Sequence, residues 1–307
     1  MIRRLTLLTN PDKCNMHCPL CFLAQRQAKF GLGEMPFATV RAAIENALKE
    51  GLREVIPSTM GEPLLYSHFA ELLELCKASG VPLNLTTNGS FPGEWGADGG
   101  MRHLLHACSD IKVSCMGFDD AVFSEMMPGG NFSKWKSNVE RLVSLAHTER
   151  AAAGAEPVST ISLQVTLHKK FAPIAGAVHS ILYWAQSLGI DRIKWNPAVF
   201  LSTAPDELVR QYALEPDEIQ ALKSQLVQSA KSCKVRCEGS LFFEPSLAAQ
   251  EPCGEDSIPC PFVDELWVLP DGSVQHCPNP ERRYGNPASP AARCSQCLMR
   301  CAPRSKF

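Results

Sequence analysis

The sequence predicts an α/β protein: a partial (β/α)6 barrel followed by a small cysteine-rich appendage that contains a β-hairpin. Short apolar or alternating runs, typical of strands, alternate about six times with segments of helical spacing. The segment lengths suit right-handed β–α–β crossovers, which indicates a parallel sheet with its site at the carboxyl ends of the strands. Six units are too few for a closed eight-unit barrel. After Glu244, helical periodicity disappears and Pro, Gly and Cys become frequent.

Each unit of the pattern places a strand before a helix. The expected strands are 3–10, 53–58, 82–89, 110–117, 160–168, 191–200 and 234–239. The expected helices are 36–51, 68–80, 101–109, 131–149, 174–188 and 215–232. Gly80 and Gly189 end two of these helices, because glycine readily adopts the left-handed conformation that closes a helix. The change of pattern near residue 245 predicts two domains, 1–244 and 245–307.

Composition narrows the classes of function. The chain has 307 residues, a formal net charge of −2 and 20% charged residues. A nearly neutral chain does not supply the phosphate neutralisation that nucleic-acid binding requires, so no nucleic-acid partner is expected. No run approaches the roughly 18–20 apolar residues of a membrane-spanning helix, so no membrane partner is expected either.

The 14 cysteines are the exception in an otherwise ordinary composition. They cluster near the two ends of the chain, and the short apolar stretch at the N-terminus leads into Asn-Pro-Asp without a signal-peptide cleavage site. A chain of this length with 45% hydrophobic residues builds a core without disulfides. We therefore expect a cytoplasmic protein whose clustered cysteines are reduced and bind metal.

The first cysteine group is Cys14-x3-Cys18-x2-Cys21, directly after the first expected strand. Three thiolates so close together can bind three irons of one 4Fe–4S cluster and leave the fourth iron without a protein ligand. A structural zinc site is the alternative, but such sites close four ligands. His17 is available as the fourth, although it lies inside the loop between two of the others.

This cysteine group resembles that of the radical S-adenosylmethionine (SAM) superfamily, whose fold is a partial barrel, and the resemblance extends over about residues 1–244. The segment MGEPLL (60–65) stands at the end of the second strand, where that family has a Gly-Gly-Glu-like motif. The resemblance implies that Gly61 and Glu62 contact SAM and that Glu62 binds its amino group. Met60 replaces the usual first glycine.

Two further strand ends carry the same resemblance. TTNG (86–89) ends the third strand, which implies a cofactor contact by Asn88. The fourth strand reads DIKVSCMG where many members have Ser-x-Asp-Gly, so Ser114 is implied to face the ribose or the carboxylate of SAM. Met116 replaces the aspartate, and no role of that carboxylate carries over. PGGNFSKW (128–135) resembles the helix start that follows this strand.

The resemblance also implies a cofactor set and a chemistry. In that family SAM chelates the open iron, and one electron cleaves its S–C5′ bond to give a 5′-deoxyadenosyl radical that abstracts a substrate hydrogen. SAM and an external one-electron reductant, such as flavodoxin or ferredoxin, are therefore expected. Strand ends supply polar contacts to the ligands, and the candidates are Gln164, Lys194 and Asn196; each is equally a candidate for a rim residue.

A second cysteine group lies in 245–307. Its Cys-x11-Gly-x4-Cys element, followed by Cys-x2-Cys, resembles the SPASM and Twitch appendages of the same superfamily, and the shorter single-cluster Twitch type fits better. The resemblance implies an auxiliary 4Fe–4S cluster held by Cys260, Cys277, Cys294 and Cys297, with Cys253 or Cys301 as alternates. A zinc knuckle is the alternative, because four closed ligands suit zinc. Residues 264–277 are typical of a β-hairpin with a Pro-Asp-Gly turn.

The remaining cysteines belong to neither of the two groups. Cys76 and Cys108 are expected in the core. Cys115 alternates with Ser114 on its strand, so it points away from the barrel interior if Ser114 faces inward. Cys233 and Cys237 flank the last strand of the barrel region. Either is a candidate hydrogen-atom donor to a product radical, and buried structural cysteine is the alternative for both.

These observations together predict a radical SAM oxidoreductase or epimerase with two 4Fe–4S clusters. A small polar substrate is expected, such as an antibiotic-pathway amino sugar, cyclitol or nucleoside sugar, undergoing dehydrogenation or epimerisation. The alternative substrate is a ribosomally made peptide that the enzyme epimerises or cross-links. From other classes, a two-cluster electron carrier and a zinc-binding module remain open. A carrier needs both clusters fully ligated, and the first cysteine group shows no fourth protein ligand.

Overall fold

The computed structural model describes residues 2–26, 29–58, 60–152, 154, 158–171, 174–201, 203–230, 233–242 and 264–275. Its strands are β1 (Arg4–Leu7), β2 (Glu54–Pro57), β3 (Leu83–Thr87), β4 (Cys108–Cys115), β5 (Thr160–Leu167), β6 (Arg192–Pro197), β7 (Arg236–Glu238), β8 (Glu265–Val268) and β9 (Val274–Gln275). Its α-helices are α1 (Phe22–Gln25), α2 (Phe37–Lys49), α3 (Phe69–Ala78), α4 (Asp98–Ala107), α5 (Asp120–Met126), α6 (Phe132–Ala152), α7 (Ile174–Leu188), α8 (Asp206–Tyr212) and α9 (Pro216–Ala230).

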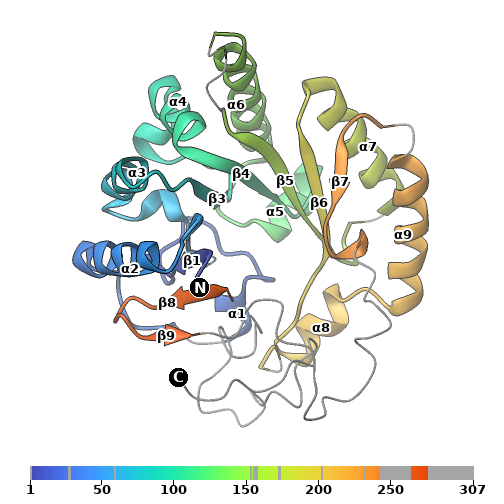
Figure 1. Cartoon of the computed structure of the whole chain (residues 1–307). Helices are drawn as coiled ribbons and strands as arrows, with labels where there is room; N and C mark the ends of the chain where they lie inside the picture. The colour runs from blue at the N-terminus through green and yellow to red at the C-terminus, as the bar shows by residue number, and fades with distance from the viewer. Residues whose placement is uncertain are drawn as a thin grey trace, which may run out of the picture.

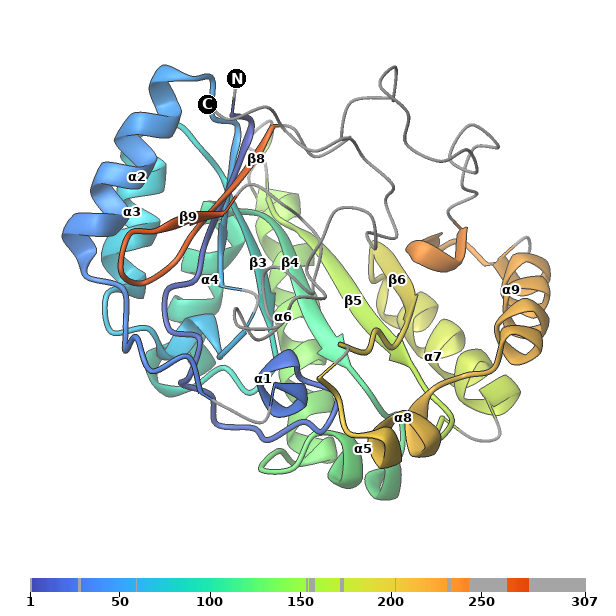
Figure 2. The ribbon, with the colours of Figure 1, turned by 90° about the horizontal axis from the view of Figure 1, so that it is seen from below.

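The described strands form one open sheet in the order β7-β6-β5-β4-β3-β2-β1-β8-β9. Strands β1 to β8 run parallel to their neighbours, and β9 is antiparallel to β8. The long helices lie along the outer side of the curved sheet (Figure 1). The short helices α1, α5 and α8 gather at the carboxyl ends of the strands (Figure 2). The predicted partial barrel is confirmed.

The two faces of the sheet differ in chemistry, and β4 shows this most clearly. Ile111 and Val113 are fully buried on the outer face, where the helices pack. The alternate residues Asp110, Lys112 and Ser114 belong to the inner face. Strands of a parallel sheet covered on both sides are usually apolar throughout. The alternation therefore marks the inner face as the side that meets polar groups.

The predicted hairpin is present, and it extends the sheet of the barrel. Strand β8 pairs with β1 in parallel, with Arg4 opposite Glu265. Gly272 occupies the turn with φ +83°, and Asp271 accepts a hydrogen bond from Ser273 N at 2.9 Å. A segment more than 260 residues from β1 in the sequence thus completes one edge of the barrel's sheet (Figure 1).

Some elements differ from the expected ones at their ends. Helix α4 begins at Asp98 rather than near residue 101, across two glycines that disfavour helix. A Cβ on Gly100 would overlap the Glu94 carbonyl, so glycine there allows the helix start to pack against the preceding turn. Helices α5 and α8 were not expected, because seven-residue helices show little periodicity.

The cysteines of the described part of the chain are all free thiols, as the reduced interpretation expects. Cys76, Cys108 and Cys115 are buried in the core, as predicted. In this same part of the chain, no helix combines the length and the apolar character that crossing a membrane requires.

Candidate functional site

The cysteine triplet lies on a loop at the carboxyl end of β1, which we call the cluster loop (residues 10–21). Asn10 anchors its start, because Asn10 Nδ2 donates a hydrogen bond to Glu62 O at 2.7 Å. Near the other end, Cys21 N donates to Cys18 O at 3.1 Å, so a tight turn brings these two residues together. Helix α1 follows directly.

Glycines allow two neighbouring loops to approach the cluster loop closely. Gly61 has φ +73°, and a Cβ there would overlap the carbonyl oxygens of Asn10 and Lys13. Gly129 has φ +94°, and a Cβ would lie 2.6 Å from Asn15 O. Both positions therefore need glycine for conformation and for space. These contacts explain why MGEP and PGGN accompany the triplet in the sequence.

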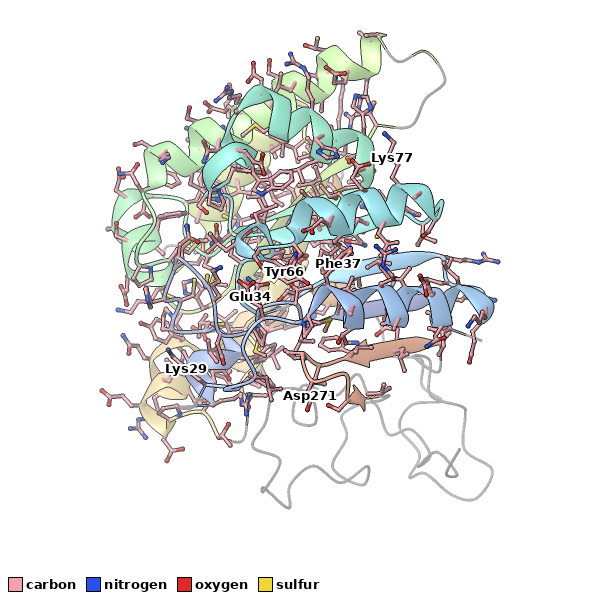
Figure 3. The ribbon with its side chains drawn as sticks, turned by 90° about the vertical axis from the view of Figure 1, so that its left-hand side faces the viewer. Lys29, Glu34, Phe37, Tyr66, Lys77 and Asp271 are labelled. Carbon is pink, nitrogen blue, oxygen red and sulfur yellow. The ribbon has the colours of Figure 1, made fainter. Side chains whose placement is uncertain are left out.

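The back of the cluster loop is tied to the segment before α2 and to the start of α3. Lys13 Nζ forms an ion pair with Glu34 Oε1 at 2.6 Å, and Glu34 also accepts hydrogen bonds from Ser67. Burial alone would raise the pKa of Glu34, but the hydrogen bonds from Lys13 and Ser67 lower it overall. Beside it, Tyr66 Oη donates to Met35 O at 2.7 Å (Figure 3).

Glu62 is the buried carboxyl of the site, with only 1% of its surface exposed. Its Oε1 accepts a hydrogen bond from Thr87 Oγ1 at 2.7 Å, and its Oε2 accepts one from Asn88 N at 2.7 Å. Burial raises the pKa of Glu62 to about 7, although these hydrogen bonds oppose the rise. An uncompensated negative charge at this position is costly, so the carboxylate is suited to bind a cation.

Asn88 links Glu62 to the cysteine triplet. Its backbone N–H binds the Glu62 carboxyl, while its side-chain Nδ2 donates to Asn15 Oδ1 at 2.8 Å and approaches Cys14 Sγ at 3.7 Å. The Asn88 Oδ1 atom accepts from Ser90 N at 2.9 Å, which holds the amide in this orientation. Three motifs that lie apart in the sequence thus meet at one point, as their order predicted.

Gln25, which sequence reasoning missed, closes the other side of the cluster loop. It is fully buried at the end of α1. Its Nε2 donates to Leu20 O at 2.9 Å and to Val199 O at 3.0 Å, and its Oε1 accepts from Leu201 N at 2.7 Å. The segment after the third cysteine is therefore joined to the segment after β6. A polar residue four positions beyond Cys21 carries no local signal of this role.

Comparisons with known proteins agree with this geometry. Residues 11–148 match the family model of the radical SAM superfamily. Residues 11–148 are thus similar to a radical SAM domain. No curated protein matches the chain.

Solved structures show the same fold at low sequence identity. SuiB from Streptococcus suis is 14% identical with a TM-score of 0.65, over 91% of this chain and 60% of SuiB. SuiB bound to its precursor peptide SuiA is 13% identical with a TM-score of 0.66, over 94% of this chain and 62% of that one. The anSMEcpe protein with bound AdoMet is 17% identical with a TM-score of 0.62, over 89% and 74% of the two chains. This chain thus spans about 60% of the length of SuiB.

The donor set of the cluster loop fits a 4Fe–4S cluster. Burial raises the pKa of Cys14, Cys18 and Cys21, and for Cys18 the neighbouring thiols Cys21 and Cys14 raise it further. The three sulfurs are therefore close enough to interact, and they become thiolates when a cation compensates the charge. Within the described residues, no group of three or more His, Cys, Asp or Glu is gathered around one metal ion. A cubane cluster does not require its ligands to surround a single ion, because each thiolate binds a separate iron.

The polar candidates lie on the inner face of the sheet. Ser114, Gln164 and Lys194 stand side by side in one row across β4, β5 and β6. Within the described residues, neither Ser114 nor Gln164 forms a side-chain hydrogen bond. Asn196 lies two residues further along β6, and its Oδ1 accepts a hydrogen bond from Ser240 N at 2.8 Å. Ser114 and Gln164 are thus available to a ligand, whereas Asn196 also holds the chain after β7.

The two candidate hydrogen donors lie elsewhere. Cys237 pairs with Ile193, whose side chain is fully buried on the outer face. Its neighbours Arg236 and Glu238 are therefore the inner-face residues of β7. Cys233 also packs against the main apolar core. The structure thus places Cys237 on the outer face and Cys233 against the core, and their role as hydrogen donors stays a prediction.

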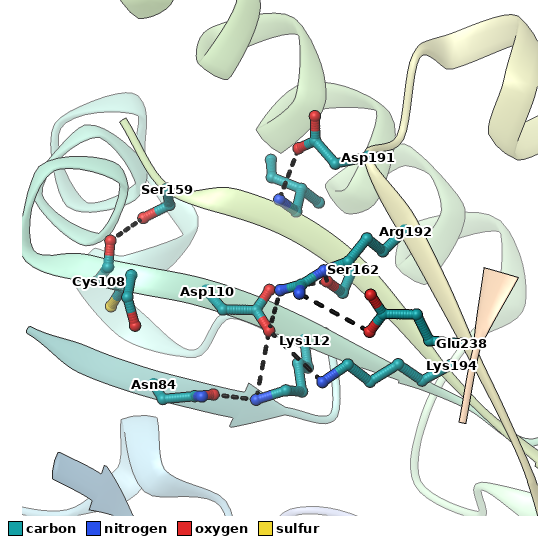
Figure 4. Close-up of polar contacts among 12 residues, drawn as sticks. Asn84, Cys108, Asp110, Lys112, Ser159, Ser162, Asp191, Arg192, Lys194 and Glu238 are labelled. Carbon is teal, nitrogen blue, oxygen red and sulfur yellow. Dashed lines mark hydrogen bonds and ion pairs between the residues drawn. The ribbon is translucent and has the colours of Figure 1, made fainter. Parts of the chain in front are cut away.

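Sequence reasoning also missed a network of charges near the amino ends of the strands. Asp110 lies at its centre, with Arg192, Lys112 and Lys194 around it (Figure 4). The signal was present in the strands: charged residues alternate with apolar ones in Asp-Ile-Lys of β4 and Arg-Ile-Lys of β6. Their partners could not be assigned, because the pairing strands are about 80 residues apart in the sequence.

The second cysteine group lies outside the described residues. It comprises the predicted auxiliary-cluster residues Cys253, Cys260, Cys277, Cys294, Cys297 and Cys301.

Proposed function

We propose that this protein is a radical SAM enzyme that cleaves SAM reductively and abstracts a hydrogen atom from a polar substrate. The observation that carries the proposal is the convergence of Cys14, Glu62 and Asn88 at the carboxyl edge of a radical SAM domain. A 4Fe–4S cluster with SAM bound supplies the one-electron cleavage that yields the 5′-deoxyadenosyl radical. The protein's own residues bind, orient and protect these groups.

Each side chain has a defined task in this proposal. Cys14, Cys18 and Cys21 hold three irons, and the backbone contacts of the cluster loop keep these thiols in place. The Glu62 carboxylate accepts the ammonium group of SAM, which compensates a charge that burial makes costly. Ser114 offers its free hydroxyl to the ribose or the carboxylate of SAM. The second carboxyl of the family pattern is replaced by Met116, so this site binds SAM with one acidic contact fewer.

We further propose that residues 245–307 form a Twitch-type appendage with an auxiliary 4Fe–4S cluster. Cys260, Cys277, Cys294 and Cys297 are its proposed ligands, with Cys253 or Cys301 as alternates. The support from the structure is the hairpin β8–β9, whose predicted strands and turn are present and join β1. Flavodoxin or ferredoxin in the cytoplasm would supply the electron. The predicted domain boundary near residue 245 belongs to the same proposal.

The inner face of the sheet supports a polar substrate, because hydroxyl, amide and charged groups line it in successive rows. A small amino sugar, cyclitol or nucleoside sugar, dehydrogenated or epimerised, is the leading class. A ribosomally made peptide is the second class, and one observation favours it. SuiB has been solved with the precursor peptide SuiA and anSMEcpe with the Kp18Cys peptide.

Metal analysis and SAM cleavage test the proposal together. Anaerobically purified protein should hold about eight irons and as many sulfides, and reduction with SAM should release 5′-deoxyadenosine. Replacing Cys18 by alanine should remove about four irons and abolish SAM cleavage. Cys76→Ala, a buried cysteine of α3, is the matched control and should retain both. Zinc without iron, or iron without any SAM cleavage, would overturn the proposed function.

A further inference from the structure

The charge network on the inner face holds more positive than negative charge. Arg192 Nη2 lies 2.7 Å from Asp110 Oδ2, and Lys112 Nζ lies 3.4 Å from the same oxygen. Arg236 is paired with Glu238 at 2.6 Å. With Lys194, four cations of β4, β6 and β7 therefore surround two carboxylates. Figure 4 labels three of these cations, Lys112, Arg192 and Lys194, which are partly buried. Like charges held together at such positions repel one another, so this region attracts an anion.

Further acidic groups lie toward β1, and one of them, Glu54, also acts on Lys112. Glu54 on β2 is bound by Arg4 at 2.9 Å and by the Asn84 amide at 2.8 Å. Glu265 on β8 is paired with Arg4 at 2.6 Å. The negative excess thus lies around Arg4 on β1, β2 and β8. The positive excess lies across β4, β6 and β7.

Lys194 is the cation of this group with the weakest partner. Its Nζ stands 4.0 Å from Asp110 Oδ2, beyond hydrogen-bond distance. Asp110 is already occupied, because its Oδ1 accepts from Ser162 Oγ at 2.7 Å and its Oδ2 faces Arg192. The Lys194 side chain keeps 24% of its surface exposed, so a ligand can reach it. Burial lowers the pKa of Lys112 to about 8; Asp110 opposes this shift, and Lys194 adds to it.

The row that contains Lys194 differs from the row beneath it. In the lower row, Lys112 donates to Asn84 Oδ1, and Ser162 and Arg192 both contact Asp110. In the row above, Ser114, Gln164 and Lys194 stand in register without hydrogen bonds among the described residues. The lower row is therefore a rigid base, and the upper row presents a hydroxyl, an amide and an ammonium to the inner side.

We propose that Lys194, with Gln164 beside it, binds an anionic group of the substrate, either a carboxylate or a phosphate. The inference rests on the proposed function in one respect: the bound anion belongs to the molecule that loses hydrogen. An ammonium and an uncharged amide donor suit such a group, because charge-assisted hydrogen bonds to oxyanions are among the strongest in proteins.

The carboxylate of SAM is not the expected occupant. Glu62 follows β2, and Lys194 belongs to β6, four strand spacings away in the sheet. At about 4.8 Å per spacing, these strands are roughly 19 Å apart along the sheet. The ammonium and the carboxylate of SAM are attached to the same carbon atom. We therefore expect a SAM molecule whose ammonium reaches Glu62 to leave Lys194 to another anion, and the SAM affinity of Lys194→Met tests this.

Calorimetric titration of the full cluster-loaded protein tests this inference. Inorganic phosphate and malonate are the two probes, titrated at constant ionic strength against a potassium chloride background and in the absence of SAM. We expect at least one of them to bind, and the tighter one identifies the anion class. Lys194→Met should weaken that binding roughly tenfold to a hundredfold. Lys194→Arg should restore most of it.

Two controls make the result decisive. Lys77→Met, the same substitution at an exposed residue of α3, should leave anion binding unchanged (Figure 3). Circular dichroism checks that Lys194→Met remains folded, and Lys194→Arg keeps the inference testable if it does not. Absence of binding by both probes, or equal binding by Lys194→Met, would overturn the inference. A tenfold loss of SAM affinity in Lys194→Met would assign the anion to SAM and overturn it as well. Anion binding without any SAM cleavage would instead overturn only the proposed function.

Discussion

The two ends of the sheet's inner face differ in how their charged side chains are paired. Near the amino ends of the strands, charged side chains have charged partners, as Asp110 has Arg192 at 2.7 Å. At the carboxyl ends, Glu62 is bound by a hydroxyl and a backbone N–H, and no cation faces it among the described residues. The first arrangement stabilises the sheet. The second leaves a buried charge for a ligand to compensate, which is typical of a binding site.

Removing the centre of the amino-end network should have the largest effect. Asp110→Ala leaves Arg192 and Lys112 partly buried without their shared carboxylate. We expect the free energy of unfolding to fall by about 3–5 kcal/mol, because an uncompensated buried charge is costly. Urea denaturation measures this change. Asp98→Ala breaks a half-exposed pair with Arg141 and should cost less than about 1 kcal/mol. Equal effects of the two variants would contradict the distinction.

At the carboxyl end, Gly61→Ala should damage the cluster loop. The added Cβ overlaps two carbonyl oxygens of that loop, and the residue already has a positive φ. We expect a loss of about 3 kcal/mol and a fall in bound iron. Gly31→Ala is the matched control, because Gly31 has φ +72° with open space around its Cβ position. If Gly31→Ala lowers stability as much, conformational strain rather than the close approach is responsible.

The charge of Glu62 should make stability depend on pH. Its pKa rises to about 7 in the folded protein, so the folded state holds its proton more tightly than the unfolded state does. Stability relative to Glu62→Gln should therefore be highest below about pH 4.5 and fall as pH rises to 7. Between pH 5 and 8 the difference should amount to roughly 2 kcal/mol in protein without SAM. A pH-independent difference would mean that Glu62 keeps an ordinary pKa. Glu62→Gln should also weaken SAM binding.

The smallest effect is expected on the outer face. Cys237→Ala removes a thiol that packs on the helix side of β7. Formation of 5′-deoxyadenosine should change by less than about twofold, since packing effects of one thiol are small. Ser114→Ala, on the inner face, should weaken SAM binding by more than about twofold. A strong effect of Cys237→Ala alone would support Cys237 as a hydrogen-atom donor.

Most of the fold could be predicted from the sequence. The strand and helix periods placed each unit of the barrel, because burial of one face imposes those periods locally. The spacing of Cys14, Cys18 and Cys21 likewise indicated the cluster loop, since ligands of one cluster must be near one another. Short elements such as α5 and α8 escaped, because seven residues carry too little periodicity.

The sequence by itself determined the order of strands and helices and the position of the cysteine triplet, because both depend on residues close together in the chain. Only the tertiary structure decided which distant residues meet. Asn88 reaches Cys14, Asp110 meets Arg192, and the hairpin β8–β9 lies beside β1. These contacts depend on the register between strands, and a shift of one residue would move every side chain to the other face. Register is set by packing across the whole sheet, which is why local patterns did not reveal Lys194 as a weakly paired cation beside Ser114 and Gln164.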